Sequence, residues 1–179
     1  MREVTLAKAE LNDGQSLYGV NDLFIGRKTH VSARYQLELE EVSEQQSSSG
    51  IIVSTGMGST GWLKSVLAGA AGIARSAAGI QSSSAEAAYT ALNQADMGRP
   101  LPWDHPELYF TVREPFPSRT TSAGLVFGRI SGNRPLRITS QMPEDGVIFS
   151  DGVESDFLEF NSGVEAAIGL AERRGRLVE

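Results

Sequence analysis

The segment around a short glycine loop constrains the fold of this chain more than any other part of it. Gly50–Thr55 is a short run rich in β-branched residues, which is typical of a buried strand. The glycine loop Gly56–Gly61 (G-M-G-S-T-G) follows, and then Trp62–Ala78, whose many Ala and Leu residues predict a helix with Ser59 or Thr60 as its N-cap. We therefore expect a strand, a tight turn and a helix in immediate succession.

Most of the remaining sequence predicts β-strands. Val31–Val42 places Tyr35, Leu37 and Leu39 at every second position, which is the pattern of a strand with one solvated face. Short apolar segments separated by turn residues are typical of a β-sandwich. The strands predicted outside the glycine-loop region are Val4–Leu11, Val31–Val42, Leu108–Val112, Gly124–Ile130, Pro135–Thr139, Val147–Ser150, Phe157–Phe160 and Val164–Leu170. Leu17–Ile25 is mostly apolar, with Asn21–Asp22 inside it.

Three segments interrupt this pattern. Gln45–Ser49 is polar and is predicted to be a loop, whereas the Ala-rich segment Gln81–Asp96 predicts a second helix. Gly98–Pro106 contains three prolines, which end the regular pattern. A length of 179 residues is typical of one domain. We therefore predict a single domain over residues 1–179 with an α+β, β-rich fold, a β-sandwich with one or two inserted helices.

Composition narrows the classes of function. The 22 acidic residues outnumber the 16 basic ones, and the net charge of −6 disfavours sequence-independent binding to nucleic acids. The chain has no cysteine and two histidines, His30 and His105, so disulfides are excluded and no metal site is expected. The N-terminus does not resemble a signal peptide, and no apolar run reaches the roughly 18 residues of a membrane span. We expect a cytoplasmic protein that binds neither nucleic acid nor a membrane.

The glycine loop matches two nucleotide-binding patterns incompletely. Gly56–Gly61 has G-x-G-x-x-G spacing between a predicted strand and a predicted helix, the context in which glycines and helix N-terminal amides bind phosphates. The acidic residue expected about 20 positions later in a dinucleotide-binding fold is missing. A Walker A loop requires Lys at the position of Trp62. The simplest alternative is a strand-to-helix turn capped by Ser and Thr.

Together with its surroundings, the loop resembles the ATP-NAD kinase family. I-V-S-T-G-M-G-S-T-G-W-L-K-S is similar to the family's conserved region, which is close to S-T-P-T-G-S-T-A-Y. Upstream, V-N-D-L-F-I-G resembles the N-E/D motif of the family, and downstream V-I-F-S-D-G-V-E resembles its late D-G hairpin. The resemblance extends from Leu17 to the C-terminus and is weak between Ile80 and Pro135. It implies the β-sandwich C-terminal domain of an NAD kinase-like fold.

The resemblance also implies which residues bind NAD. The pair Asn21–Asp22 occupies the N-E/D motif and would contact the ribose or adenine region of the nucleotide. In the T-A-Y segment, the Thr60 hydroxyl would hydrogen-bond the ligand and Gly61 would allow its close approach. Trp62 replaces the usual Tyr and would stack on a flat ring. Ser65 lies one helical turn beyond Gly61 and would face the same site.

The sequence departs from the family at several positions. Ser49 stands where the family has an Asp that contacts NAD, Gly56 replaces a Pro, and Met57 replaces a small polar residue. The G-G-D-G motif, whose Asp is the family's base for the ribose hydroxyl proton, is missing, and the chain contains no G-G pair. In the family this motif belongs to an N-terminal α/β domain. We therefore expect that this domain and the catalytic base lie outside the chain, which alone turns over little or nothing.

Each candidate residue also has a structural interpretation. The pair Asn21–Asp22 is common in turns and at helix starts. Trp62 is suited to anchor a core or an interface, and Ser65 is an ordinary helix residue. Asp151–Gly152 lies between two predicted strands, where D-G is a strong hairpin signal, and we interpret it as structural. Arg113 is suited to bind phosphate, but such arginines are more often surface salt-bridge partners.

Three hypotheses of function remain. In the first, the chain is the NAD-binding domain of an NAD kinase-like phosphotransferase and positions the adenosine ribose 2'-hydroxyl for phosphoryl transfer from ATP to give NADP. NAD is then the substrate, and the family implies ATP and Mg²⁺ for the full-length protein. In the second, which the loss of the carboxylate at Ser49 favours slightly, the chain is a non-catalytic nucleotide-binding or oligomerisation module. In the third, it is a lipid or sugar kinase-like domain.

The first hypothesis depends on one geometric expectation. The segment Ile51–Ser65 must bring the amino end of its helix beside Asn21 and Asp22 and form one concave polar pocket with them. Family members often build the site across subunits, so a homo-oligomer is also expected.

Overall fold

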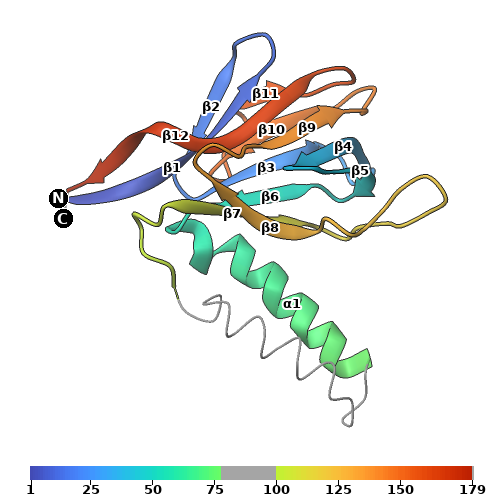
Figure 1. Ribbon diagram of the computed structural model, residues 1–179, viewed down its shortest axis with the longest axis horizontal. Coiled ribbons are helices and arrows are strands. Elements are labelled where there is room, and N and C mark those ends of the chain that lie inside the picture. Colours follow the sequence, from blue (N-terminus) through green and yellow to red (C-terminus); the bar gives the residue numbers. More distant parts are fainter. Residues whose placement is uncertain (78–99, 179) are drawn as a thin grey trace.

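The described residues form two six-stranded β-sheets that lie face to face, with one helix leading away from them (Figure 1). This computed structural model describes residues 1–77 and 100–178. Sheet A has the strand order β2-β1-β12-β9-β4-β5, and sheet B has the order β11-β10-β3-β6-β7-β8. The elements are β1 (Arg2–Leu11), β2 (Ser16–Gly19), β3 (Asp22–Arg27), β4 (Ala33–Leu39), β5 (Val42–Ser48), β6 (Ile51–Ser54), the 3-10 turn η1 (Gly58–Thr60), α1 (Trp62–Ala77), β7 (Glu107–Val112), β8 (Phe127–Ser131), β9 (Leu136–Ser140), β10 (Gly146–Ser150), β11 (Phe157–Glu159) and β12 (Glu165–Leu177).

The hydrophobic core lies between the two sheets, because alternate side chains of the strands point inward. Tyr35 and Leu37 from sheet A are fully buried in the same cluster as Leu23 and Ile25 from sheet B. Arg34, which faces outward immediately before Tyr35, is exposed. The predicted β-rich sandwich is therefore confirmed, as is the period-two pattern of β4.

One sequence-based prediction of a loop is wrong. The polar segment Gln45–Ser49 is not a loop, because its first four residues belong to β5, which pairs with β4. The mostly apolar segment Leu17–Ile25 divides at Val20–Asn21 into β2 of sheet A and β3 of sheet B. The second helix predicted over Gln81–Asp96 lies outside the described residues.

The polar side chains of β5 tolerate burial because they find hydrogen-bond partners. Ser48 Oγ lies 2.7 Å from the hydroxyl of Tyr35, and Gln46 donates to the backbone oxygen of Leu125 at 3.0 Å. A buried polar group without such a partner would cost free energy. The alternation of apolar residues could not predict this strand, because its inward-facing side chains are polar and hydrogen-bonded.

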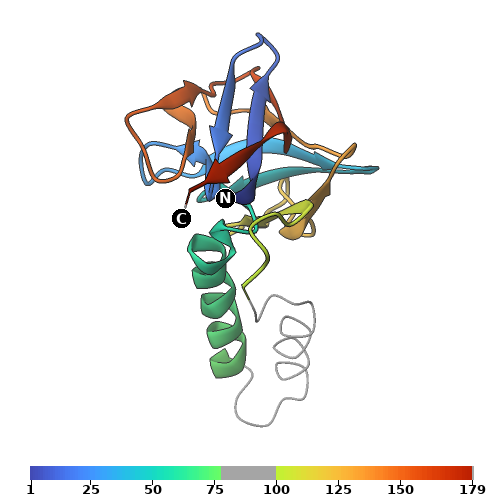
Figure 2. The same ribbon diagram turned by 90° about the vertical axis from the view of Figure 1, so that its left-hand side faces the viewer.

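Helix α1 packs on sheet B through its first two turns. Trp62 and Val66 contact an apolar cluster on the outer face of that sheet, while Leu63 and Leu67 pack beside Tyr109. Farther along, Ile73 is 72% exposed, and Figure 2 shows the helix extending away from the sandwich. Within residues 1–77 and 100–178, no helix has the length and apolar character needed to cross a membrane.

Candidate functional site at the amino end of the helix

The glycine loop is fixed to the turn between β2 and β3. Strand β6 pairs with β3, with Ser54 opposite Asp22. Immediately after β6, the backbone N–H of Thr55 donates to the oxygen of Asn21 at 2.9 Å. The Thr55 hydroxyl donates to the oxygen of Val20 at 2.6 Å. The loop and the Asn21–Asp22 turn, which are more than thirty positions apart in the sequence, therefore form one unit.

Two glycines of the loop allow this close approach. A Cβ atom on Gly58 would lie 2.1 Å from the backbone oxygen of Asn21, and one on Gly56 would lie 2.0 Å from that of Pro102. Both distances are far below van der Waals contact with backbone atoms that cannot rotate away. The G-x-G part of the motif is thus needed to pack the chain on itself, whatever the loop binds.

The start of α1 differs from the predicted cap. The 3-10 turn η1 precedes the helix, and its N-cap Met57 makes no side-chain cap hydrogen bond. Ser59 Oγ instead donates to the oxygen of Gly56 at 2.7 Å and accepts the N–H of Leu101 at 3.1 Å. Since the N–H of Ser65 donates to the oxygen of Gly61, Gly61 and not Ser59 or Thr60 directly precedes α1 as its N-cap.

The carboxylate of Asp22 lies beside this helix start. A Cβ on Gly61 would be 3.9 Å from its Oδ2 atom. Its Oδ1 atom is buried and has no hydrogen-bond partner in the described part of the chain. Burial raises the pKa of Asp22 to about 6, the nearby charge of Asp151 adds to the increase, and a hydrogen bond with Ser54 opposes it. Asp22 is therefore a carboxylate with unused acceptor capacity next to a helix end that favours negative charge.

Asp151 holds the Asn21–Asp22 turn in place, a role that the sequence did not reveal. Its carboxylate accepts N–H bonds from three consecutive residues: Val20 at 2.9 Å, Asn21 at 2.6 Å and Asp22 at 3.2 Å. The N–H of Asp151 in turn donates to the oxygen of Asp22 at 2.9 Å. The predicted hairpin is confirmed, because β10 and β11 pair across it. Asp151 has a second role as the anchor of a turn about 130 positions away.

Trp62 faces a cavity on the outer surface of sheet B. Its ring stacks on Phe24 with centroids 5.6 Å apart and an interplanar angle of 9°. The Arg113 guanidinium lies 5.3 Å from the Trp62 ring centroid. The cavity has a volume of about 640 Å³, and Ser49, at the position of the family's Asp, also lines it.

The structure brings some of the predicted site residues together and separates others. Asp22 lies beside Gly61 at the helix start, and Asn21 packs against Gly58 of the loop. Thr60 and Ser65 are exposed. The Ser65 hydroxyl donates to the oxygen of Gly61 at 3.3 Å. The cavity next to Trp62 is lined by none of these five residues, so this site and the cavity adjoin at Trp62 but do not form one pocket.

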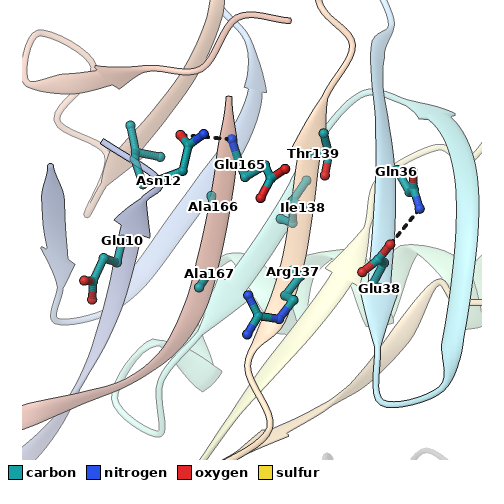
Figure 3. Close-up of a pocket in the computed structure, with 11 residues that line it drawn as sticks. Glu10, Asn12, Gln36, Glu38, Arg137, Ile138, Thr139, Glu165, Ala166 and Ala167 are labelled. Carbon is teal, nitrogen blue, oxygen red and sulfur yellow. Dashed lines mark hydrogen bonds between the residues drawn. The ribbon is translucent and has the colours of Figure 1, made fainter. Parts of the chain in front are cut away.

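A second cavity lies on the outer face of sheet A. Its volume is about 530 Å³, and Figure 3 shows Glu10, Arg137 and Glu165 on neighbouring strands around it. Gln36 and Glu38 of β4 are joined there by a hydrogen bond of 2.6 Å. No aromatic side chain lines this cavity. Its charged side chains, Glu10, Glu38, Arg137 and Glu165, distinguish it from typical small-molecule sites, which are lined mostly by apolar and aromatic groups.

Within residues 1–77 and 100–178, no cluster of three or more His, Asp or Glu side chains is arranged to hold a metal ion.

A comparison with solved structures identifies a similar fold. The fold alone defines a β-sandwich with a glycine loop and a helix at one sheet. It is similar to the crystal structure of yeast NADH kinase complexed with NADH, with a TM-score of 0.59 and 14% sequence identity. The match covers 94% of this chain and 40% of that chain, so the chain spans less than half the length of the yeast enzyme. The chain therefore has an NAD kinase-like fold.

No family model and no curated protein matches the sequence.

Proposed function

We propose that this chain is the nucleotide-binding domain of an NAD kinase-like phosphotransferase and that it binds NAD or NADH at the amino end of α1. Asn21, Asp22, Thr60, Gly61 and Ser65 would contact the nucleotide, and the ring of Trp62 would form one boundary of the site. The observation on which this proposal depends is that Asp22 lies beside Gly61 and that one of its carboxylate oxygens is buried without a hydrogen-bond partner in the described part of the chain. A ribose hydroxyl would donate to the Asp22 carboxylate.

The likeness to yeast NADH kinase supports this proposal at the level of the fold. In the complete protein, the domain would orient the adenosine ribose 2'-hydroxyl toward the phosphoryl group of ATP. Transfer of this kind depends on positioning and on the neutralisation of charge by metal ions. The described residues offer no metal-ligand cluster. ATP, Mg²⁺ and the base would therefore be held mainly outside this domain, and binding without turnover is expected of the chain alone.

Calorimetric titration of the chain with NAD, NADH, NADP and ATP tests this proposal. We expect NAD or NADH to bind and Asn21→Ala to weaken the binding by about tenfold, since one hydrogen bond to a polar ligand is worth about 0.5–1.5 kcal/mol. Arg137→Ala on the outer face of sheet A is the matched control and should bind normally. The proposal is wrong if no nucleotide binds at millimolar concentration, or if Asn21→Ala and the control bind equally well.

A further inference from the structure

The paired ends of β1 and β12 form a two-stranded ribbon that extends past the other strands of sheet A. Strand β2 pairs with β1 only over residues 7–10, and β9 pairs with β12 only over residues 165–168. Residues 2–5 of β1 pair with residues 174–177 of β12. Figure 1 shows this β1–β12 ribbon at one end of the molecule, beside both chain termini. In the described part of the chain, no further strand lies along either of its outer edges.

The β1 edge of the ribbon is covered by the loop that precedes β7. The backbone N–H of Thr5 donates to the oxygen of Trp103 at 2.9 Å, and the Thr5 hydroxyl donates to the oxygen of His105 at 2.8 Å. The guanidinium of Arg2 lies 4.4 Å from the centroid of the Trp103 ring. Another extended chain therefore has no access to this edge.

The β12 edge of the ribbon is open. Within residues 1–77 and 100–178, no backbone hydrogen bond joins β12 beyond Ile168 to any segment except β1. Glu172, Arg173, Arg174 and Arg176 are all exposed there. A strand edge of this kind presents a row of unpaired N–H and C=O groups, onto which another extended chain can add through backbone hydrogen bonds.

The ribbon is basic although the chain is acidic. Residues 2–5 and 173–177 contain four arginines and one glutamate, whereas the whole chain has a net charge of −6. None of these arginines forms an ion pair with a described residue. Glu3 lies opposite Arg176 in the register but is exposed, so water and salt screen its charge. The open edge thus carries positive charge that the ribbon itself does not neutralise.

The register fixes which side chains share a face of the ribbon. Arg174 donates to the Thr5 hydroxyl at 3.0 Å, and Arg176, two positions further on, lies on the same face. Gly175 and Leu177 lie on the opposite face. A strand added to this edge would place alternate side chains beside the two arginines and the others beside Gly175 and Leu177. Acidic residues suit the first set of positions, and apolar residues suit the second.

A charged edge with an irregular register is also a common protection against aggregation. The pairing of β1 with β12 shifts between Thr5 and Ala7, which disturbs the edge near that point. These features disfavour apolar strands and basic strands, because like charges on neighbouring strands repel each other. They do not disfavour an acidic strand, whose charges would be opposite to those of the edge.

We propose that the open edge of β12 binds an extended acidic segment of a partner protein in which acidic and apolar residues alternate. The backbone of that segment would pair with β12, and its carboxylates would lie beside Arg174 and Arg176. A nucleic acid or a membrane would also attract the arginines, but neither would pair with the backbone of the edge. The inference goes beyond the proposed function and does not rest on it, since no residue placed at the nucleotide site lies on the β1–β12 ribbon.

A fluorescein-labelled peptide of alternating Glu and Val tests this inference by fluorescence anisotropy with the complete chain. We expect saturable binding that weakens as salt is added, because salt screens exposed charges. The same peptide N-methylated at every residue keeps its charge but has no backbone donors. A peptide with Lys in place of Glu keeps the donors but reverses the charge. Both should bind at least about tenfold more weakly.

Variants of Arg176 then test the contribution of charge on the protein. Arg176 makes no side-chain hydrogen bond with a described residue, whereas Arg174 also donates to the oxygen of Asp104 and supports the loop. Arg176→Glu should weaken binding of the Glu-Val peptide about threefold to tenfold, and Arg176→Lys should largely retain it. Arg34→Glu, at an exposed arginine of β4, is the matched control and should bind like the wild type. Thermal melting establishes that each variant is folded.

Hydrogen exchange supplies the structural measurement, because amides among residues 173–177 should exchange more slowly when the peptide is bound. Three results would overturn the inference. The first is no saturable binding at about 1 mM peptide. The second is equal binding of the N-methylated peptide, since charge alone would then attract it. The third is a dimer in sedimentation velocity that Arg176→Glu abolishes, since the edge would then pair with a second copy of the chain.

Discussion

The outer faces of the two sheets differ, although both sheets pack on the same core. The outer face of sheet A has polar and charged side chains such as Gln36, Glu38 and Arg137 around a shallow cavity (Figure 3). The outer face of sheet B buries Phe24 and Phe149 under the first turn of α1. Sheet B therefore buries both faces of its central strands, and the candidate site lies where that burial ends. In this sandwich, the strands that are apolar on both faces belong to the sheet that carries α1 and the candidate site.

The largest effect on stability should come from the aromatic cluster of Phe24, Trp62 and Phe149 on the outer face of sheet B. Phe24→Ala removes a ring that is 6% exposed and stacks on two others, so we expect the free energy of unfolding to fall by about 3–5 kcal/mol. Arg137→Ala on the outer face of sheet A should change it by less than about 0.5 kcal/mol. Urea unfolding of both variants measures the contrast, and equal losses would show that the two faces do not differ in this way.

A smaller loss is expected where the glycine loop meets the β2–β3 turn. Gly58→Ala places a methyl group against the backbone of Asn21, and such overpacking costs about 1–3 kcal/mol. Gly69→Ala is the matched control within α1, where an added Cβ meets nothing within 4 Å. It should stabilise the chain by about 1 kcal/mol, because Ala favours helix more than Gly does. If Gly58→Ala is also neutral or stabilising in urea unfolding, the close packing of the loop is not as described.

The Asp151 anchor should have a moderate effect. Asp151→Ala leaves three backbone N–H groups of the β2–β3 turn without their acceptor, and the partial exposure of the site limits the loss to about 1–2 kcal/mol. Asp156→Ala in the same loop should be nearly neutral. Hydrogen exchange adds a local measurement: the amides of Asn21 and Asp22 should exchange faster in Asp151→Ala only. Unchanged exchange would refute this role of Asp151.

The smallest effect is a dependence of stability on pH, with opposite signs in the two sheets. The pKa of Asp22 is raised from 3.8 to about 6. Its contribution to the free energy of unfolding is therefore complete below pH 3.8 and is lost as the pH rises through about 6. Solvent screening of this partly buried group limits the loss to about 1 kcal/mol. Asp22→Asn should abolish it in urea unfolding between pH 4 and about 7.

Asp13, in the β1–β2 hairpin of sheet A, provides the contrast. Hydrogen bonds from the backbone and side chain of Gln15 lower its pKa, so its contribution is present above the usual pKa and is lost in acid. Asp13→Asn should therefore reduce the free energy of unfolding at neutral pH. It should leave unchanged the decrease in that free energy above pH 4, which comes from Asp22. A wild-type profile that does not fall between pH 4 and about 6 would contradict the environment assigned to Asp22.

Local patterns predicted much of the fold, and contacts distant in sequence account for what they missed. The order strand, loop and helix followed from the β-branched run and the Ala-rich segment, and the resemblance placed the amino end of α1 beside the Asn21–Asp22 turn. Strand β5 was missed because Tyr35 and Leu125 satisfy its inward polar groups from other elements.

The same reason explains what was missed at the site. The anchoring by Asp151 depends on backbone N–H groups about 130 positions away, which no residue pattern reveals. The cavity near Trp62 was missed because its lining comes from several strands and the loops after them: Phe24 and Arg27 lie on β3, and Phe149 lies opposite Phe24 on β10. The N-cap predicted at Ser59 or Thr60 is wrong, because both residues belong to the 3-10 turn that precedes α1.

The most direct test of the account is an NMR titration of the isotopically labelled chain with NAD. The account predicts that chemical shifts change at the helix start and the adjoining turn, including the amides of Asn21, Asp22, Gly61 and Ser65 and the indole N–H of Trp62. The outer face of sheet A, followed through Glu10, Arg137 and Glu165, should stay unperturbed. Shift changes confined to sheet A, or none at saturating NAD, would contradict it.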